Sequence, residues 1–107
     1  MQALAALADP IRRQIIEMLA DGERDAGELA AAFPVSQPAV SRHLRVLREA
    51  GLVQVRPEAQ RRVYVLDPRP LAELSRWLDR YRGFWSQRLD ALDVELARGR
   101  RQRGAGR

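Results

Sequence analysis

The chain has 107 residues, of which 46% are hydrophobic and 31% charged, and its net charge is +5. This composition is typical of one globular domain, and no apolar run approaches the roughly 18 residues of a membrane span. The absence of cysteine excludes disulfides, thiolate metal sites and cysteine nucleophiles. All nineteen basic residues are arginine, and the basic balance favours a polyanionic partner. The start MQALAALADP lacks the features of a secretion signal, so we expect a cytoplasmic protein.

A short apolar segment near the N-terminus, containing Leu4 and Leu7, indicates a separate helix. The next predicted helix begins at Asp9-Pro10, because aspartate accepts hydrogen bonds from the first free amides and proline suits the first turn. Its apolar residues recur at helical spacing as far as Asp21-Gly22, where glycine favours a helix end.

Two further helices are predicted, with a short connection between them. Asp25 and Glu28 have the spacing of a capping box, which predicts a short helix that Pro34 ends. Ser36 is placed to cap the following helix, which should end near Gly51. Two short helices joined by about three residues are the signature of a helix-turn-helix.

The pattern then changes twice. LVQVRP and RRVYVL are rich in β-branched residues and flank residues 58–60, so they predict a β-hairpin. From residue 67, leucines and aromatic residues at three- and four-residue spacing predict one long helix of about seven turns, which Gly83 could loosen or kink. We therefore expect a folded domain over 1–97 and a disordered basic tail over 98–107, where only Ala105 is apolar.

This order of elements predicts a mostly α protein with a small β-hairpin, a winged helix-turn-helix with a long C-terminal dimerisation helix. The segments ALADPIRRQIIEML, GELAAAFPVSQPAVSRHLRVLREAGLV and RRVYVLDP resemble the ArsR/SmtB-type bacterial transcriptional repressors. The ending WLDRYRGFWSQRLDALDVEL resembles the metal-independent, autorepressor-like branch of that family. The resemblance implies a homodimeric repressor that binds a palindromic operator in double-stranded DNA.

Two departures from that family concern metal sensing. Metal-sensing members carry a cysteine motif in the helix before the recognition helix, where this chain has GELAAAF. Others place histidines and acids on the final helix, where this chain has only arginines and acids. Carboxylates alone are poor ligands for zinc, nickel or copper, so we expect no metal site and no cofactor. A small-molecule inducer of unknown identity stays an alternative.

The helix after Ser36 has two contrasting faces. Val40, Leu44 and Leu47 form an apolar stripe, and the opposite arc carries hydroxyl, amide and guanidinium groups. In a helix-turn-helix this arc enters the major groove, where glutamine pairs with adenine and arginine with guanine. Arginines around a hairpin turn either keep an edge strand soluble or, as favoured here, contact phosphates. The predicted DNA-binding residues are Ser36, Gln37, Pro38, Ser41, Arg42, Arg45, Arg56, Arg61 and Arg62.

Three other polar residues are less specific. His43 borders the buried side of its helix and has no second ligand nearby, so we expect it to pack or hydrogen-bond at the helix edge rather than hold a metal. Arg12 and Arg13 suit a DNA backbone contact and a solvated surface equally well.

The apolar stripe of the last predicted helix continues further than so small a domain can cover, and residues 77–85 hold four aromatics. Packing against a second copy would bury them; a ligand pocket is the alternative. The predicted dimer-interface residues are Leu4, Leu7, Leu74, Leu78, Tyr81, Trp85, Leu89 and Leu92.

Other function classes fit the sequence less well. An enzyme is not expected, since there is no cysteine, no histidine pair and no glycine-rich phosphate loop. A winged helix that holds a protein partner is the second hypothesis, and a gel shift on promoter DNA would separate it from the first. RNA or membrane association through the arginine tail is the third, although the tail lacks an apolar face.

Overall fold

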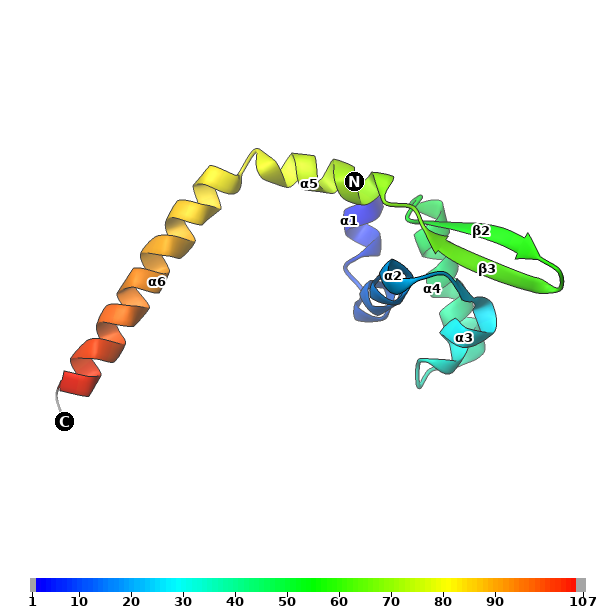
Figure 1. Ribbon diagram of the computed structural model, residues 1–107, viewed down its shortest axis with the longest axis horizontal. Helices are drawn as coiled ribbons and strands as arrows, with labels where there is room; N and C mark the ends of the chain where they lie inside the picture. Colours follow the sequence, from blue (N-terminus) through cyan, green and yellow to red (C-terminus); the bar gives the residue numbers. More distant parts are fainter. Residues whose placement is uncertain (1, 106–107) are drawn as a thin grey trace. The chain divides into compact units, whose positions relative to one another are not determined.

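The computed structural model describes the backbone of residues 2–105 and the side chains of residues 2–99. It forms two compact units that meet between Leu74 and Ser75. The elements in chain order (Figure 1) are α1 (Gln2–Ala6), α2 (Pro10–Asp21), β1 (Arg24–Asp25), α3 (Ala26–Ala31), α4 (Gln37–Glu49), β2 (Val53–Glu58), β3 (Arg61–Leu66), α5 (Arg69–Asp79) and α6 (Arg82–Ala105).

The predicted helix starts are confirmed by their capping bonds. The Asp9 carboxylate accepts from the amides of Ile11 and Arg12, at 2.8 and 3.2 Å, and so starts α2. Asp25 and Glu28 form both bonds of a capping box at the start of α3, at 2.8 and 3.2 Å. These bonds satisfy amides that have no partner within their own helix.

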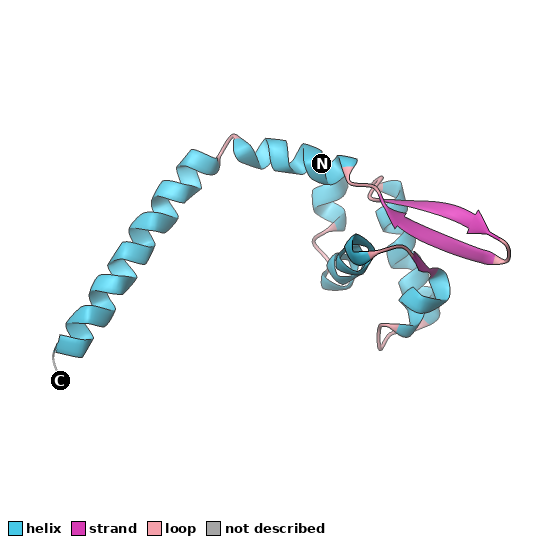
Figure 2. Ribbon diagram, viewed as in Figure 1, coloured by secondary structure: helices cyan, strands magenta, loops and turns pink. Residues whose placement is uncertain are grey.

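The sheet has three antiparallel strands in the order β1-β3-β2 (Figure 2). The predicted hairpin is confirmed: β2 and β3 pair from Val53↔Leu66 to Glu58↔Arg61. Only residues 59 and 60 remain in the turn, where Ala59 adopts the left-handed φ of 56° that glycine or asparagine takes more readily. The strand β1 was not predicted, because two residues are too few for a pattern.

The core lies between the helices and one face of this sheet. The three apolar residues predicted to face inward from α4 are all buried, which confirms that part of the sequence interpretation. They pack in one cluster with residues of α1 to α3 and of the hairpin: Ala3, Ala6, Ile15, Ile16, Leu19, Leu29, Leu52, Val53 and Tyr64. Figure 1 shows the hairpin turn projecting beyond these helices, the arrangement of a wing.

The prediction of one long final helix is wrong. Amides of Arg80 and Tyr81 bond to carbonyls three residues back, at 3.3 and 3.0 Å, so the chain tightens and α5 ends. The helix then restarts at Arg82, and Gly83 lies inside its first turn, where glycine is tolerated. No helix of the described residues is both long and apolar enough to cross a membrane.

The predicted basic tail, residues 98–107, begins inside α6. The helix α6 continues through residues 98–105, while 106 and 107 lie outside the described residues. Arginine and glutamine are good helix formers, so a helix already started can extend through them without apolar contacts.

Asp67, between β3 and α5, is the buried acid of the first unit. It accepts bonds from Arg69 Nη2 and Nε, at 2.6 and 3.0 Å, from the Arg69 amide at 3.1 Å, and from Gln54 Nε2 at 3.2 Å. The Arg69 guanidinium first, then that amide and Gln54, hold the pKa of Asp67 well below its ordinary value of 3.8.

This lowered pKa predicts a pH-dependent stability. Because the folded pKa lies below the unfolded one, the contribution is present above about pH 4 and is lost as the pH falls further. Asp67→Asn should therefore lower the free energy of unfolding at pH 7 and lose less of it than wild type between about pH 5 and pH 2. Urea unfolding across this range checks the prediction, and parallel curves for the two proteins would contradict it.

Candidate nucleic-acid interface

The outward face of α4 carries six of the predicted site residues. All six side chains are exposed: Ser36, Gln37, Pro38, Ser41, Arg42 and Arg45. At helical spacing, Pro38, Ser41, Arg42 and Arg45 face away from the buried stripe of Val40, Leu44 and Leu47, and Gln37 flanks that arc. Ser36 is also the N-cap, since its hydroxyl oxygen accepts from the Ala39 amide at 3.2 Å. The first turn of α4 thus presents amide and hydroxyl groups, and arginines follow one and two turns later.

A hollow of about 270 Å³ lies between α4 and the wing, and we call it the arginine hollow. It is lined by Ser41, Arg42, Arg45 and Arg48 from α4 and by Arg62 and Tyr64 from β3. No acid lines it, and none of these four arginines forms an ion pair with another described residue. Four guanidiniums without carboxylates make a surface suited to phosphate oxygens.

Arg48 was not among the predicted site residues, although the structure brings it into the arginine hollow. The sequence did hold a signal for it. Arg48 follows Arg45 by three residues, and residues at that spacing are neighbours on a helix surface.

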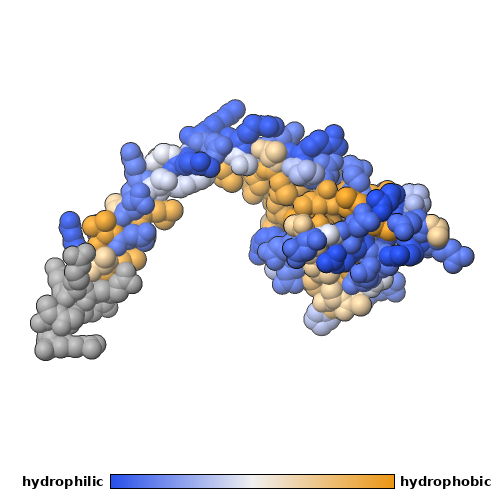
Figure 3. Space-filling model, viewed as in Figure 1, coloured by the Kyte–Doolittle hydropathy of each residue, from blue (hydrophilic) through white to orange (hydrophobic). Residues whose placement is uncertain are grey.

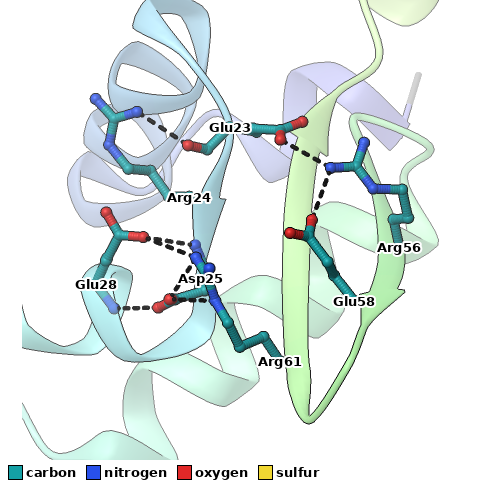
Figure 4. Close-up of polar contacts among 7 residues, drawn as sticks. All are labelled: Glu23, Arg24, Asp25, Glu28, Arg56, Glu58 and Arg61. Carbon is teal, nitrogen blue, oxygen red and sulfur yellow. Dashed lines mark hydrogen bonds and ion pairs between the residues drawn. The ribbon is translucent and has the colours of Figure 1, made fainter.

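The three predicted wing arginines differ from one another in their partners, and Figure 4 shows those of Arg56 and Arg61. Arg56 Nη2 lies 2.7 Å from Glu23 and 3.2 Å from Glu58. Arg61 Nη2 lies 2.9 Å from Asp25 and 3.7 Å from Glu28. Arg62 forms no ion pair with the described residues; it lines the arginine hollow and also, with Asp25 and Arg61, a second hollow beside the hairpin turn.

These contacts shift two ionisation equilibria. The amide of Glu28 and then the charge of Arg61 lower the pKa of the Asp25 carboxyl, while bonds to Glu23 and Glu58 raise the pKa of Arg56. Asp25 therefore stays a carboxylate throughout the neutral range. The sequence predicted the charges of Arg56 and Arg61 but missed these partners, which lie as far as 36 residues away.

His43 has the helix-edge role that the sequence predicted. Its Nδ1 lies 3.3 Å from Arg12 Nη1 and 3.9 Å from the Asp9 carboxylate. Arg12 Nε also donates to the carbonyl of Ala6 at 2.6 Å, and Arg13 donates to two further carbonyls after α1, at 3.0 and 3.3 Å. Both arginines thus donate to backbone carbonyls at and just after the end of α1, which lack a partner within the helix. Neither of the two roles considered from the sequence included this one.

Most of the residues predicted for a dimer interface are exposed in the single chain: Leu4, Leu78, Tyr81, Leu89 and Leu92. Leu74 and Trp85 are half-buried. Leu7 differs, because it packs against the core of its own unit. Further exposed apolar residues of α6 are Phe84, Val94 and Leu96, and apolar surface is visible along this helix in Figure 3.

No group of three or more His, Cys, Asp or Glu side chains is placed to hold a metal ion anywhere in the part of the chain that the structure describes. Asp25 caps α3 and Asp67 pairs with Arg69.

A helix-turn-helix with an adjoining wing and an arginine-lined hollow between them defines the chain as a winged-helix DNA-binding protein. The family described as "Bacterial regulatory protein, arsR family" matches residues 9–55. The chain belongs to this ArsR family, as its resemblance indicated, and is a DNA-binding transcriptional regulator.

Individual relatives support this assignment. The chain is 54% identical over 88 residues to the HTH-type transcriptional regulator Rv2034 of Mycobacterium tuberculosis, covering 82% of this chain and 79% of that one. It is 33% identical to the transcriptional repressor SdpR of Bacillus subtilis, over 68% of this chain and 81% of that one. The solved structure of an ArsR-like transcriptional regulator from Rhodococcus sp. RHA1 matches with a TM-score of 0.69 and 32% identity, covering 85% and 86% of the two chains.

Proposed function

We propose that the protein is a homodimeric repressor that occupies a near-palindromic operator overlapping a promoter. The observation that carries the proposal is the arginine hollow, whose four guanidiniums between α4 and the wing form no ion pair with any residue that the structure describes. DNA against this hollow would bring its backbone to Arg62 and the first turns of α4 into the major groove. Arg42, on the α4 side of the hollow, would then read base edges together with Gln37.

Two copies are part of the proposal because of the exposed apolar side chains of α5 and α6. Burying one leucine or large aromatic stabilises by about 1.5–3 kcal/mol, so several together support a stable dimer. Two-fold symmetry would then present two recognition helices roughly 34 Å apart, or a multiple of this spacing, to matching half-sites. The proposed repressor needs no metal, cofactor or catalytic step.

The test is a footprint on the upstream region of the protein's own gene, with and without cell extract to reveal a small-molecule inducer. A protected near-palindrome and a promoter that becomes more active when the gene is deleted are expected. Protection with a less active promoter would make the protein an activator. No protection, together with capture of a protein partner, would favour the winged helix as a protein-interaction module.

The affinity for this DNA should fall steeply with salt, since each neutralised phosphate releases counterions and contributes about −0.9 to the log–log slope. Arg62→Gln should make the slope less steep by about 0.9 and weaken binding to all sequences alike. Fluorescence titrations at several salt concentrations give both values. An affinity that hardly changes with salt would contradict DNA binding through the arginine hollow.

A further inference from the structure

Neighbouring arginines on β3 lie on opposite faces of the sheet, because successive side chains of a strand alternate. Arg62 shares its face with Tyr64, and both line the arginine hollow beside α4. Arg61 lies on the other face. The pairing Arg56↔Val63 puts Arg56 on this second face too, since directly paired residues point the same way.

The second face carries two separate sets of ion pairs, one around Arg56 and one around Arg61, which together we call the wing clasp (Figure 4). It consists of Glu23, Asp25, Glu28, Arg56, Glu58 and Arg61. Two guanidiniums therefore face four carboxylates, the reverse of the balance in the arginine hollow. Such an excess of acid repels a phosphate backbone, so this face is poorly suited to contact DNA.

The wing clasp joins the outer part of the hairpin to the start of the helix-turn-helix. Arg61 is the first residue of β3, next to the turn, and its partners Asp25 and Glu28 are the two residues of the α3 capping box. The strand β1 pairs only with Tyr64 and Val63, so Arg61 holds the hairpin beyond the last backbone pairing on that side. A two-stranded hairpin is only marginally stable by itself, so the ion pairs of Arg61 can stabilise the outer part of the hairpin.

We infer that Arg56 and Arg61 are positioning residues for DNA binding and not DNA contacts: the wing clasp fixes the hairpin against α3 and thereby sets where Arg62 lies relative to α4. The inference rests on the proposed function as a DNA-binding regulator. Without the clasp the hairpin would sample other orientations, and the affinity would fall in proportion to the fraction that remains competent to bind.

The decisive variant is Asp25→Asn, because asparagine is as good an N-cap as aspartate, while the oxygen that accepts from Arg61 is replaced by an uncharged NH2 group that cannot accept. Asp25→Asn and Arg61→Gln should each weaken operator binding about three- to tenfold, the range for one or two exposed ion pairs. The double variant should bind no more weakly than Arg61→Gln alone, and Arg61→Lys should restore part of the affinity. The salt slope should stay at the wild-type value in all of them.

Arg62→Gln is the matched control, one residue along the same strand but on the face of the arginine hollow. It should lower the magnitude of the salt slope by about 0.9, and Asp25→Asn should not alter that effect. The inference is overturned if Asp25→Asn tightens DNA binding, because this would mean that Arg61 had been freed to contact a phosphate. A decrease of about 0.9 in the slope of Arg61→Gln would overturn it as well.

Amide hydrogen exchange of the free protein separates this inference from the proposed function. Asp25→Asn and Arg61→Gln should speed exchange in β2 and β3, whereas Arg62→Gln should not. Unchanged exchange in the first two variants would refute the wing clasp even if the wild-type protein binds DNA. If the wild-type protein binds no DNA, the proposed function fails, and the exchange rates still decide whether the clasp holds the wing.

Discussion

A variant with both Leu89 and Leu92 replaced by arginine should sediment as a monomer and lose most of its affinity for the operator. Both side chains are about half exposed in the single chain, at 56% and 49%, so the substitution spares the core. A two-fold interface would lose four leucines, each worth about 1.5–3 kcal/mol, and this loss is comparable to the roughly 8 kcal/mol of association free energy of a micromolar dimer. Operator affinity should then fall at least roughly 100-fold. In a dimer, binding of one half-site holds the second DNA-binding unit close to the other half-site, and separate monomers lose this high effective concentration.

Gln87→Arg is the control for added charge, since Gln87 is exposed on the opposite side of α6 and its replacement adds one positive charge, half of what the double variant adds. It should leave both the sedimentation and the binding as in wild type. Circular dichroism establishes that the double variant keeps its helices. A double variant that stays dimeric, or a monomer that still binds the operator tightly, would contradict the proposed dimer.

Gln37→Ala and Arg42→Ala should each cost about 1–3 kcal/mol of operator affinity and relax the preference at particular base positions. Both side chains are exposed in the first two turns of α4, the part of a recognition helix that reaches base edges. Titrations against operators with single base changes measure the preference. Arg62→Gln serves as the contrast, because a phosphate contact weakens binding to every operator alike; unchanged preferences in both α4 variants would contradict their role as base readers.

Local chemistry made much of the first unit predictable from the sequence. The starts of α2 and α3 follow from Asp9 and from the pair Asp25 and Glu28, whose side chains bond amides only two or three residues away. The buried stripe of α4 follows from helical periodicity alone, which in turn placed Arg42 and Arg45 on the outer face.

Features that depend on contacts between distant segments could not be predicted in this way. Arg56 meets Glu23 across 33 residues, and this contact depends on the hairpin register and on a two-residue strand without a pattern. The break before Arg82 was also missed, because the apolar spacing continues through it and backbone bonds at Arg80 and Tyr81 decide where α5 ends. Periodicity thus identified the exposed face of α4, but it could not identify the ion pairs that connect the wing to residues before α4.

The arginine hollow contains no lysine, and neither does the rest of the chain. Guanidinium groups stay protonated at every pH a living cell reaches, and enzymes that acetylate lysine cannot neutralise them. The positive charge of the hollow is therefore insensitive to pH and to lysine acetylation, and the strength of its attraction for a polyanion varies with salt. In the proposed repressor, release from DNA would therefore require a change in geometry and not in the charge of the four guanidiniums. The distance between the two DNA-binding units, or the angle between the wing and α4, would have to change.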